Sequence, residues 1–385
     1  MNHKFRTTLA LLLGLAVGLQ AQDNNRWTLF QTLDWEGRLA FLQNQSTPLE
    51  DDFLRQALDL TDSARIESGP ENELVLKRTI AIQIIRLLSE RPVPASAGAI
   101  ARIPTQYKDP VLRGEAWLAL AKLGERPLIP SLVRSLNTLN ESGQRTRNEE
   151  IQANYLIQAF GIFKAPEAFR AVVGATLGWY SPASQVKPLA RKTLPLLVPD
   201  YEAAVLNLLT NDDDLTLREG LFLAVVDQGN AEFSGRAAAA VLQTLVRLQA
   251  ADKTDQDRTE RLILAALLAA QKSPSPQDSL VPSLKVLVTR SSSYQEVIQS
   301  VQLLGKIDDP AALAFLSSTL TGFNTRQKSG TNKNSDLAVV RELFLALGQT
   351  GKASARIPLN DARFSDYTPA LVREAQDALD KLPRE

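Results

Sequence analysis

Acidic residues are the main candidates for chemistry in this sequence, because the single histidine is His3, the single methionine is Met1 and cysteine is absent. The densest acidic group is Asn211-Asp212-Asp213-Asp214, whose oxygens are of the type that calcium binds. The group lacks the glycine and the distal glutamate of an EF-hand loop, and Asp214 also suits the N-cap of a following helix. We therefore expect a solvated loop here, with no metal ion and no cofactor.

The residue types present after the N-terminal segment exclude several mechanisms. Without imidazole or thiol groups, the part of the chain after Ala21 has neither a Ser-His-Asp or Cys-His centre nor a zinc site with Cys or His ligands. Mechanisms that use two carboxylates, as in glycoside hydrolysis, stay open. Phosphate-binding loops of the G-x-x-x-x-G-K-[ST] type are also missing. These absences favour a protein that is not an enzyme.

The N-terminus resembles an export signal. Lys4 and Arg6 precede an apolar run from Leu9 to Leu19, and cleavage is expected near Ala21. An uncleaved anchor or a buried first helix are the alternatives, although the run is shorter than the ~20 apolar residues that span a bilayer. No later stretch predicts an integral membrane span. The absence of cysteine suits a bacterial periplasm or exterior.

The overall composition is that of a folded, soluble chain of 385 residues, with 44% hydrophobic and 22% charged residues. The 43 basic residues equal the 43 acidic ones and are mixed with them along the chain. Nucleic-acid binding requires a basic surface, so we expect no nucleic-acid partner. Aromatic residues make up 6% while Leu and Ala recur throughout, which favours helices over strands.

A repeated pattern organises most of the chain. In residues 109–139, Asp109-Pro110 suits a helix start, Leu112, Ala116 and Ala119 follow at helical spacing, and Gly124 suits the helix end. A second apolar helix follows from Pro127. Similar units begin near residues 73, 148, 184, 214, 257, 293 and 335, and a period in this range indicates stacked helical hairpins.

These units resemble HEAT repeats, including the short bacterial repeats named after phycobilisome lyases. The resemblance rests on Asp109-Pro110-Val111-Leu112-Arg113, Gly124 and Pro127-Leu128-Ile129-Pro130, and it is weaker over 214–249 and 335–351. It implies an all-α, right-handed α-solenoid of HEAT-like (armadillo-like) helical hairpins. The Asp and Arg of each unit are expected to cap and link helices. We predict a signal peptide at 1–21, an N-terminal helical cap at 22–72 and a repeat array at 73–385 that ends in a C-terminal capping helix at 368–382. Exposed loops are predicted at 140–148, 250–257 and 322–335.

Members of this family often bind proteins on the concave surface that their second helices line. We therefore predict a non-catalytic protein–protein interaction scaffold of the periplasm or cell exterior. The alternative is a carboxylate-based enzyme or accessory factor that acts on an envelope glycan. Polar side chains on the second helices are the candidate contacts with a protein partner, possibly one with an acidic segment, and a solvated face is their other interpretation: Arg134, Arg170, Arg236, Gln243, Arg247 and Lys285.

Overall fold

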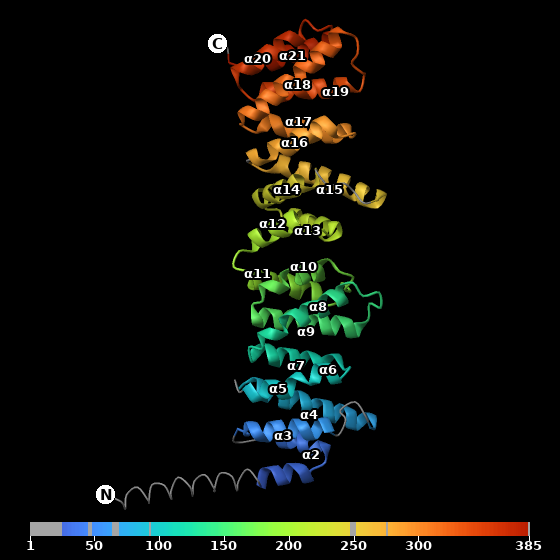
Figure 1. Cartoon of the computed structure of the whole chain (residues 1–385), viewed down its shortest axis with the longest axis vertical. Helices are drawn as coiled ribbons and strands as arrows, with labels where there is room; N and C mark the ends of the chain where they lie inside the picture. Colours follow the sequence, from blue (N-terminus) through green and yellow to red (C-terminus); the bar gives the residue numbers. More distant parts are fainter. Residues whose placement is uncertain are drawn as a thin grey trace, which may run out of the picture. The chain divides into compact units, whose positions relative to one another are not determined.

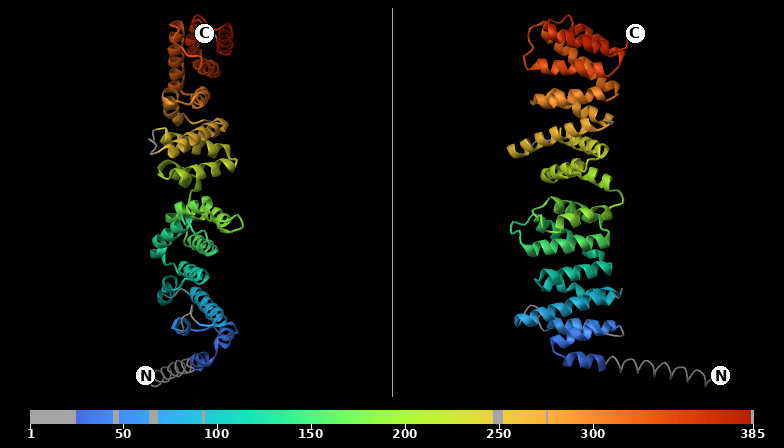
Figure 2. Two further views of the ribbon diagram at one scale, coloured as in Figure 1. Left: turned by 90° about the vertical axis from the view of Figure 1, so that its right-hand side faces the viewer. Right: turned by 180° about the vertical axis from the view of Figure 1, so that it is seen from behind.

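The computed structural model describes residues 25–44, 48–63, 69–91, 94–246, 252–274 and 276–383, and these residues form helices and connecting turns without a strand. The chain divides into two compact units, Met1–Pro199 and Asp200–Glu385. Each unit consists of antiparallel helices stacked in layers (Figures 1 and 2).

The first unit begins with a helical segment at residues 25–32, followed by these helices: α2 (Trp35–Gln43), α3 (Asp51–Ser63), α4 (Glu71–Ser89), α5 (Pro94–Ala101), α6 (Ile103–Gln106), α7 (Pro110–Lys122), α8 (Ile129–Asn140), α9 (Arg147–Phe163), α10 (Phe169–Leu177) and α11 (Val186–Leu197). The second unit contains these helices: α12 (Tyr201–Asn211), α13 (Leu215–Asp227), α14 (Ala231–Leu245), α15 (Lys253–Lys272), α16 (Val281–Arg290), α17 (Tyr294–Lys306), α18 (Pro310–Lys328), α19 (Asp336–Gln349), α20 (Arg356–Ala362) and α21 (Pro369–Asp380).

Helix starts and ends depend on local side chains. The Asp109 carboxylate accepts the Leu112 amide at 2.8 Å, and Asp214 accepts the amides of Thr216 and Leu217 at 2.9 and 3.1 Å. Gly124 and Gly229 end α7 and α13 with φ of +80° and +74°, a conformation that costs glycine little. The starts predicted near residues 109, 148 and 214 correspond to Pro110, Arg147 and Leu215.

Four hairpins turn through a short 3₁₀ helix before their second helix. These 3₁₀ helices are η1 (Arg126–Leu128), η2 (Pro166–Ala168), η3 (Asp278–Leu280) and η4 (Ala353–Ala355). A proline lies within or just after each of them, where its fixed φ suits the first turn of a helix. A buried Leu follows three residues into each of α8, α16 and α20, and these are Leu132, Leu284 and Leu359.

Helices stack with helices of the same kind. The first helices of the hairpins are α7, α9, α13, α15, α17 and α19, and the second helices are α8, α10, α14, α16, α18 and α20. First helices contact first helices, as α7 with α9 and α17 with α19, and second helices contact second helices, as α8 with α10 and α18 with α20. Fully buried residues such as Leu112, Phe160, Val225 and Phe344 lie between the layers. The prediction of an all-α solenoid of HEAT-like hairpins is confirmed.

The N-terminal part of the first unit has an aromatic core. The rings of Trp27, Phe30, Phe41 and Phe53 lie 5.3–5.9 Å apart in edge-to-face and stacked pairs. The guanidinium of Arg38 lies 4.5 Å from the Trp35 ring. These contacts account for the aromatic residues of this region as packing. The predicted signal peptide lies outside the described residues, and its boundary with the cap stays a prediction.

The predicted loop at 322–335 is wrong over its first half. Helix α18 continues to Lys328, so residues 322–328 are helical. The Asn332 side chain then folds back, donating to the Phe323 carbonyl at 3.1 Å and to Gln327 Oε1 at 3.1 Å. Gly322 and the polar residues after it suggested a loop, but Leu316, Leu320 and Asn324 are fully buried at helical spacing. Among the described residues, no helix has both the length and the apolar character needed to cross a bilayer.

Candidate functional site

The predicted contact residues fall in both units. Arg134 on α8 and Arg170 on α10 are exposed in the first unit. Arg236 and Gln243 on α14, with Lys285 on α16, lie in the second unit, and Arg247 lies outside the described residues. The predicted residues therefore divide between the two units, and each set has its own surroundings.

Arg236 is already paired within the second unit. Its guanidinium forms an ion pair with Glu202 of α12 and lies 5.7 Å from the Phe233 ring centroid. Its side chain is 37% exposed and that of Glu202 38%, so the pair is half-buried. Arg236 therefore links α14 to α12, and a partner's carboxylate would have to compete with Glu202.

The other predicted residues of the second unit also have internal contacts. Gln243 Nε2 donates to the Ser279 carbonyl at 3.4 Å, and the Lys285 ammonium lies 5.6 Å from the Phe315 ring centroid. Both contacts join neighbouring second helices or the turn between them. Cations close to aromatic faces are weakly attracted to them and keep their charge available to solvent or a ligand.

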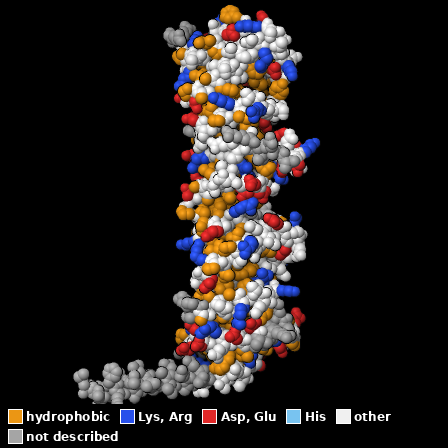
Figure 3. Space-filling view, in the orientation of Figure 1, with side chains coloured by type: hydrophobic (Ala, Val, Ile, Leu, Met, Phe, Trp, Pro, Cys, Tyr) orange, Lys and Arg blue, Asp and Glu red, His pale blue; other side chains and the backbone are white. Residues whose placement is uncertain are grey.

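The fold nevertheless sorts charge between the two kinds of helix. Helix α12 contacts α14 and so lies with the second helices, which then contain three acidic residues: Glu202, Glu232 and Asp361. The first helices contain acidic and basic residues in similar proportion. On the face that Figure 3 shows, both signs of charge are interspersed. The basic residues of the second helices are Arg134, Arg170, Arg236, Lys285, Arg290, Arg326, Lys328 and Arg356.

Several charges on the first helices and on α4 form ion pairs between layers. Arg86 of α4 binds Glu115 of α7 with Nε–Oε2 at 2.9 Å, and Arg258 of α15 binds Glu219 of α13 at 3.0 Å. Arg341 of α19 contacts Glu374 of α21 at 2.8 Å. Such pairs align successive hairpins. No local pattern in the sequence indicates them, since the partners lie about one repeat apart.

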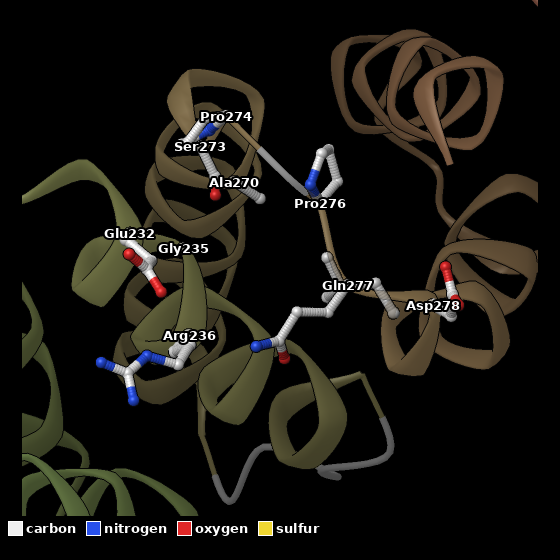
Figure 4. Close-up of a pocket in the computed structure, with 10 residues that line it drawn as sticks. Glu232, Gly235, Arg236, Ala270, Ser273, Pro274, Pro276, Gln277 and Asp278 are labelled. Carbon is white, nitrogen blue, oxygen red and sulfur yellow. The ribbon is translucent and has the colours of Figure 1, made fainter. Parts of the chain in front are cut away.

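Arg236 lines a cavity of the second unit whose lining also includes two carboxylates (Figure 4). The cavity has a volume of about 560 Å³ and lies between α14, the end of α15 and η3. Glu232 and Arg236 are one turn apart on α14, while Asp278 lies on the opposite side of the view. The Gln277 side chain extends toward α14, and the Arg236 guanidinium points away from it. The cavity thus has two carboxylates that do not converge on one point.

The acidic run at 212–214 has a structural explanation. Asp214 caps α13, and the Asp212 carboxylate accepts the Asp214 amide at 3.0 Å. Arg218, one turn into α13, is buried, and its burial lowers the pKa of its guanidinium while Asp212 and Asp213 raise it. Within the described ranges, no group of three or more Asp, Glu, His or Cys residues is arranged to hold a metal ion.

A buried polar cluster joins three layers of the first unit. Glu115 is 8% exposed, and it accepts hydrogen bonds from Arg86 and from the Tyr155 hydroxyl, the latter at 3.2 Å. Burial first, and then the charge of Glu115, raise the pKa of Tyr155 to about 12. In the second unit, burial raises the pKa of Tyr367 to about 12 as well.

These raised tyrosine pKa values predict how stability changes in alkali. The folded state keeps the Tyr155 proton to higher pH than the unfolded chain, whose tyrosine pKa is about 10. The stability that this proton contributes is therefore complete below pH ~10 and is lost as pH rises toward ~12. We expect the thermal midpoint of the natural chain to fall more steeply across this range than that of Tyr155→Phe. Parallel curves, with tyrosinate absorbance followed in the same samples, would contradict this.

Comparisons with known proteins show no family for this chain. No family model matches the chain, and no curated protein matches it. Among solved structures, it is similar to human deoxyhypusine hydroxylase in complex with glycerol, at 15% identity and a TM-score of 0.27. The match covers 87% of this chain and 99% of that one. At this identity and TM-score, no property of that protein carries over to this chain.

This finding corrects the prediction of function. The similar structure is that of an enzyme, as its name states, and this contradicts the prediction of a non-catalytic scaffold. The prediction that the chain is not an enzyme rests on missing residue types and on the repeat pattern. This prediction is wrong, because neither observation decides whether a protein is an enzyme. A fold does not fix whether its surface carries chemistry, because function depends on the site built on the fold. The neighbour's activity is not assigned to this chain.

Proposed function

We propose that the chain binds an acidic polypeptide through the exposed faces of its second helices. The proposal concerns binding and leaves open whether the bound polypeptide is also a substrate. The observation that supports it is the sorting of charge, in which basic residues greatly outnumber acidic ones on the second helices. Exposed charges of one sign raise the association rate of an oppositely charged partner and help select it.

Exposed positions on these helices favour the proposal over a purely structural role. Arg134 and Arg290 are exposed, on α8 and at the end of α16. By contrast, Arg236 pairs with Glu202, so it is a poor probe of binding. The screening length is about 8 Å at physiological ionic strength, so binding through such residues is expected to weaken with added salt.

The test is charge reversal on the two kinds of helix. The variant Arg134→Glu/Arg290→Glu reverses charge on second helices, and Lys122→Glu/Lys272→Glu reverses exposed charges at the ends of the first helices α7 and α15. We expect the former to reduce capture of acidic proteins from a host extract by about tenfold or more, because like charges then face each other. The control should capture normally. Quantitative mass spectrometry measures both.

Both variants should melt within a few degrees of the natural chain, because surface substitutions usually change stability by about 0.5 kcal/mol. Equal capture by the two folded variants would sink the proposal, because charge on the second helices would then make no specific contribution. Loss of capture only in the control would assign binding to the first helices.

We also propose that the chain is exported, to the periplasm or the exterior, and that its mature form begins near Gln22. The support is the sequence of the first 21 residues, with Lys4 and Arg6 before an apolar run. N-terminal sequencing of the chain isolated from its natural host should find this start. Recovery of a form that keeps Met1 in the cytoplasm would contradict export.

A further inference from the structure

We propose that a second cavity in the second unit anchors a large apolar side chain that stands beside an acidic residue in the polypeptide partner. The inference rests on the proposed binding of an acidic polypeptide and names where one part of it docks. The cavity has a volume of about 440 Å³ and lies where the end of α16, the start of α17, the last turns of α18 and the start of α19 meet. Its volume falls in the range of ~300–1,000 Å³ typical of ligand sites.

The cavity has an apolar side formed by several helices. Val297 of α17 and Val339 of α19 are 8% and 3% exposed, and Val288 of α16 and Phe323 of α18 are half-buried beside them. Water held against such a surface is released favourably when an apolar group replaces it. An aromatic or large aliphatic side chain therefore fits this side, and residues of that kind commonly anchor protein interfaces in pockets.

One cation lies at this cavity without a carboxylate partner among the described residues. Arg326 follows Phe323 by three residues on α18, so the two side chains share a face of the helix. The guanidinium carbon lies 4.1 Å from the Phe323 ring centroid, and Nε donates to the amide oxygen of Asn332 at 3.2 Å. Both partners are neutral, which distinguishes Arg326 from Arg236. A carboxylate from outside can pair with Arg326 without displacing an internal one.

The other polar groups at the cavity are either neutral or already hydrogen-bonded within the chain. Asp336 also lines the cavity. Its carboxylate lies in the first turn of α19, where a negative charge is favourable, and accepts a hydrogen bond from the Lys333 amide at 3.1 Å. The Tyr294 hydroxyl lies 2.7 Å from Ser335 Oγ and 3.5 Å from Asp336 Oδ1. Thr289 and Thr319 contribute neutral hydroxyls. The apolar side chain of a partner would therefore contact the apolar side of the cavity, and the partner's neighbouring carboxylate would contact the Arg326 guanidinium.

The test uses the full chain and a short probe peptide. The probe is a capped, fluorescein-labelled peptide with one tryptophan flanked by glutamates, and its partner probe has glutamines in place of the glutamates. Fluorescence anisotropy should show the glutamate form binding about tenfold more tightly. Arg326→Gln should remove this difference, while Thr319→Phe, which fills part of the cavity, should weaken both probes. Melting curves show that each variant is folded.

Arg363→Gln is the matched control, because Arg363 also lies near a ring, 5.8 Å from the centroid of Phe364, but does not line the cavity. It should bind both probes as the natural chain does. Equal affinity of the two probes, or equal losses in Arg363→Gln and Arg326→Gln, would overturn the inference. Tighter binding of an uncapped peptide that ends in tryptophan would also overturn it, in favour of a chain-terminal carboxylate.

The outcomes separate this inference from the proposed function. If Arg134→Glu/Arg290→Glu loses capture while Arg326→Gln keeps the preference for glutamate, the second-helix proposal stands and the cavity assignment fails. If Arg326→Gln loses the preference while Arg134→Glu/Arg290→Glu captures normally, the cavity binds its probe and the wider charged face does not contribute.

Discussion

Alanine in place of Gly305 is expected to destabilise the second unit by about 2 kcal/mol, which lowers its thermal midpoint by several degrees. Gly305 lies on α17, where an added Cβ would come within 2.8 Å of both Cα and Cβ of Ala346 on α19. These atoms belong to the backbone or are fixed to it, so the two first helices must move apart. The gain in helix propensity from Gly to Ala, about 1 kcal/mol, offsets only part of this cost.

The control is Gly322→Ala on the neighbouring helix α18, where an added Cβ meets nothing within 4 Å. That substitution should stabilise the chain by about 0.5–1 kcal/mol through reduced entropy of the unfolded chain. Differential scanning calorimetry of the full chain measures both. A Gly305→Ala variant as stable as Gly322→Ala would show that the contact between α17 and α19 yields at little cost.

Much of the fold is predictable because several hairpins carry their own local signals. Asp109 and Asp214 cap helices, Gly124 and Gly229 end them, and apolar residues recur at helical spacing. These signals act over a few residues, so one sequence suffices to find them. Packing between layers involves residues about one repeat apart, such as Arg86 with Glu115, and a local pattern does not identify such partners.

The candidate site was harder to predict for the same reason. The six predicted residues were chosen as exposed side chains of second helices, but Arg236 proved to be paired with Glu202. Arg326 is not among the predicted contact residues, because the sequence predicts a loop over residues 322–335. Because α18 continues to Lys328, the side chains of Phe323 and Arg326 lie on one face of this helix and line a cavity. The buried residues Leu316, Leu320 and Asn324, at spacings of four, were the signal that could have extended this helix.

The inference about catalysis failed for a different reason. The absence of cysteine, and of histidine after His3, excludes particular mechanisms, but carboxylates, hydroxyls and arginines remain on the surface of any such chain. Glu232 and Asp278 line one cavity, yet they lie on opposite sides of it (Figure 4). Repeat architecture positions helices and leaves the exposed side chains free to differ. Binding and chemistry must therefore be argued from individual cavities.

In the ion pair between Arg86 and Glu115, we expect removal of Arg86 to destabilise the first unit more than removal of the Glu115 charge. The Glu115 side chain is 9% exposed, whereas that of Arg86 is 55% exposed. Arg86→Met leaves a buried carboxylate whose remaining hydrogen-bond donor is the Tyr155 hydroxyl. A fully buried charge left unpaired costs about 3–5 kcal/mol, so at this partly screened site we expect a loss of about 2 kcal/mol.

Glu115→Gln should cost less, about 1 kcal/mol, because the amide keeps the size of the side chain and can still accept from Arg86, whose charge reaches water. Urea unfolding of the two variants and of the natural chain, followed through the first unit's transition, gives the order. If Glu115→Gln is the more destabilised variant, then Arg86 depends on the carboxylate more than the carboxylate depends on Arg86, and the deeper burial of Glu115 does not decide the order. The expected order follows because the buried Glu115 carboxylate loses more solvation than the exposed Arg86 guanidinium when its partner is removed.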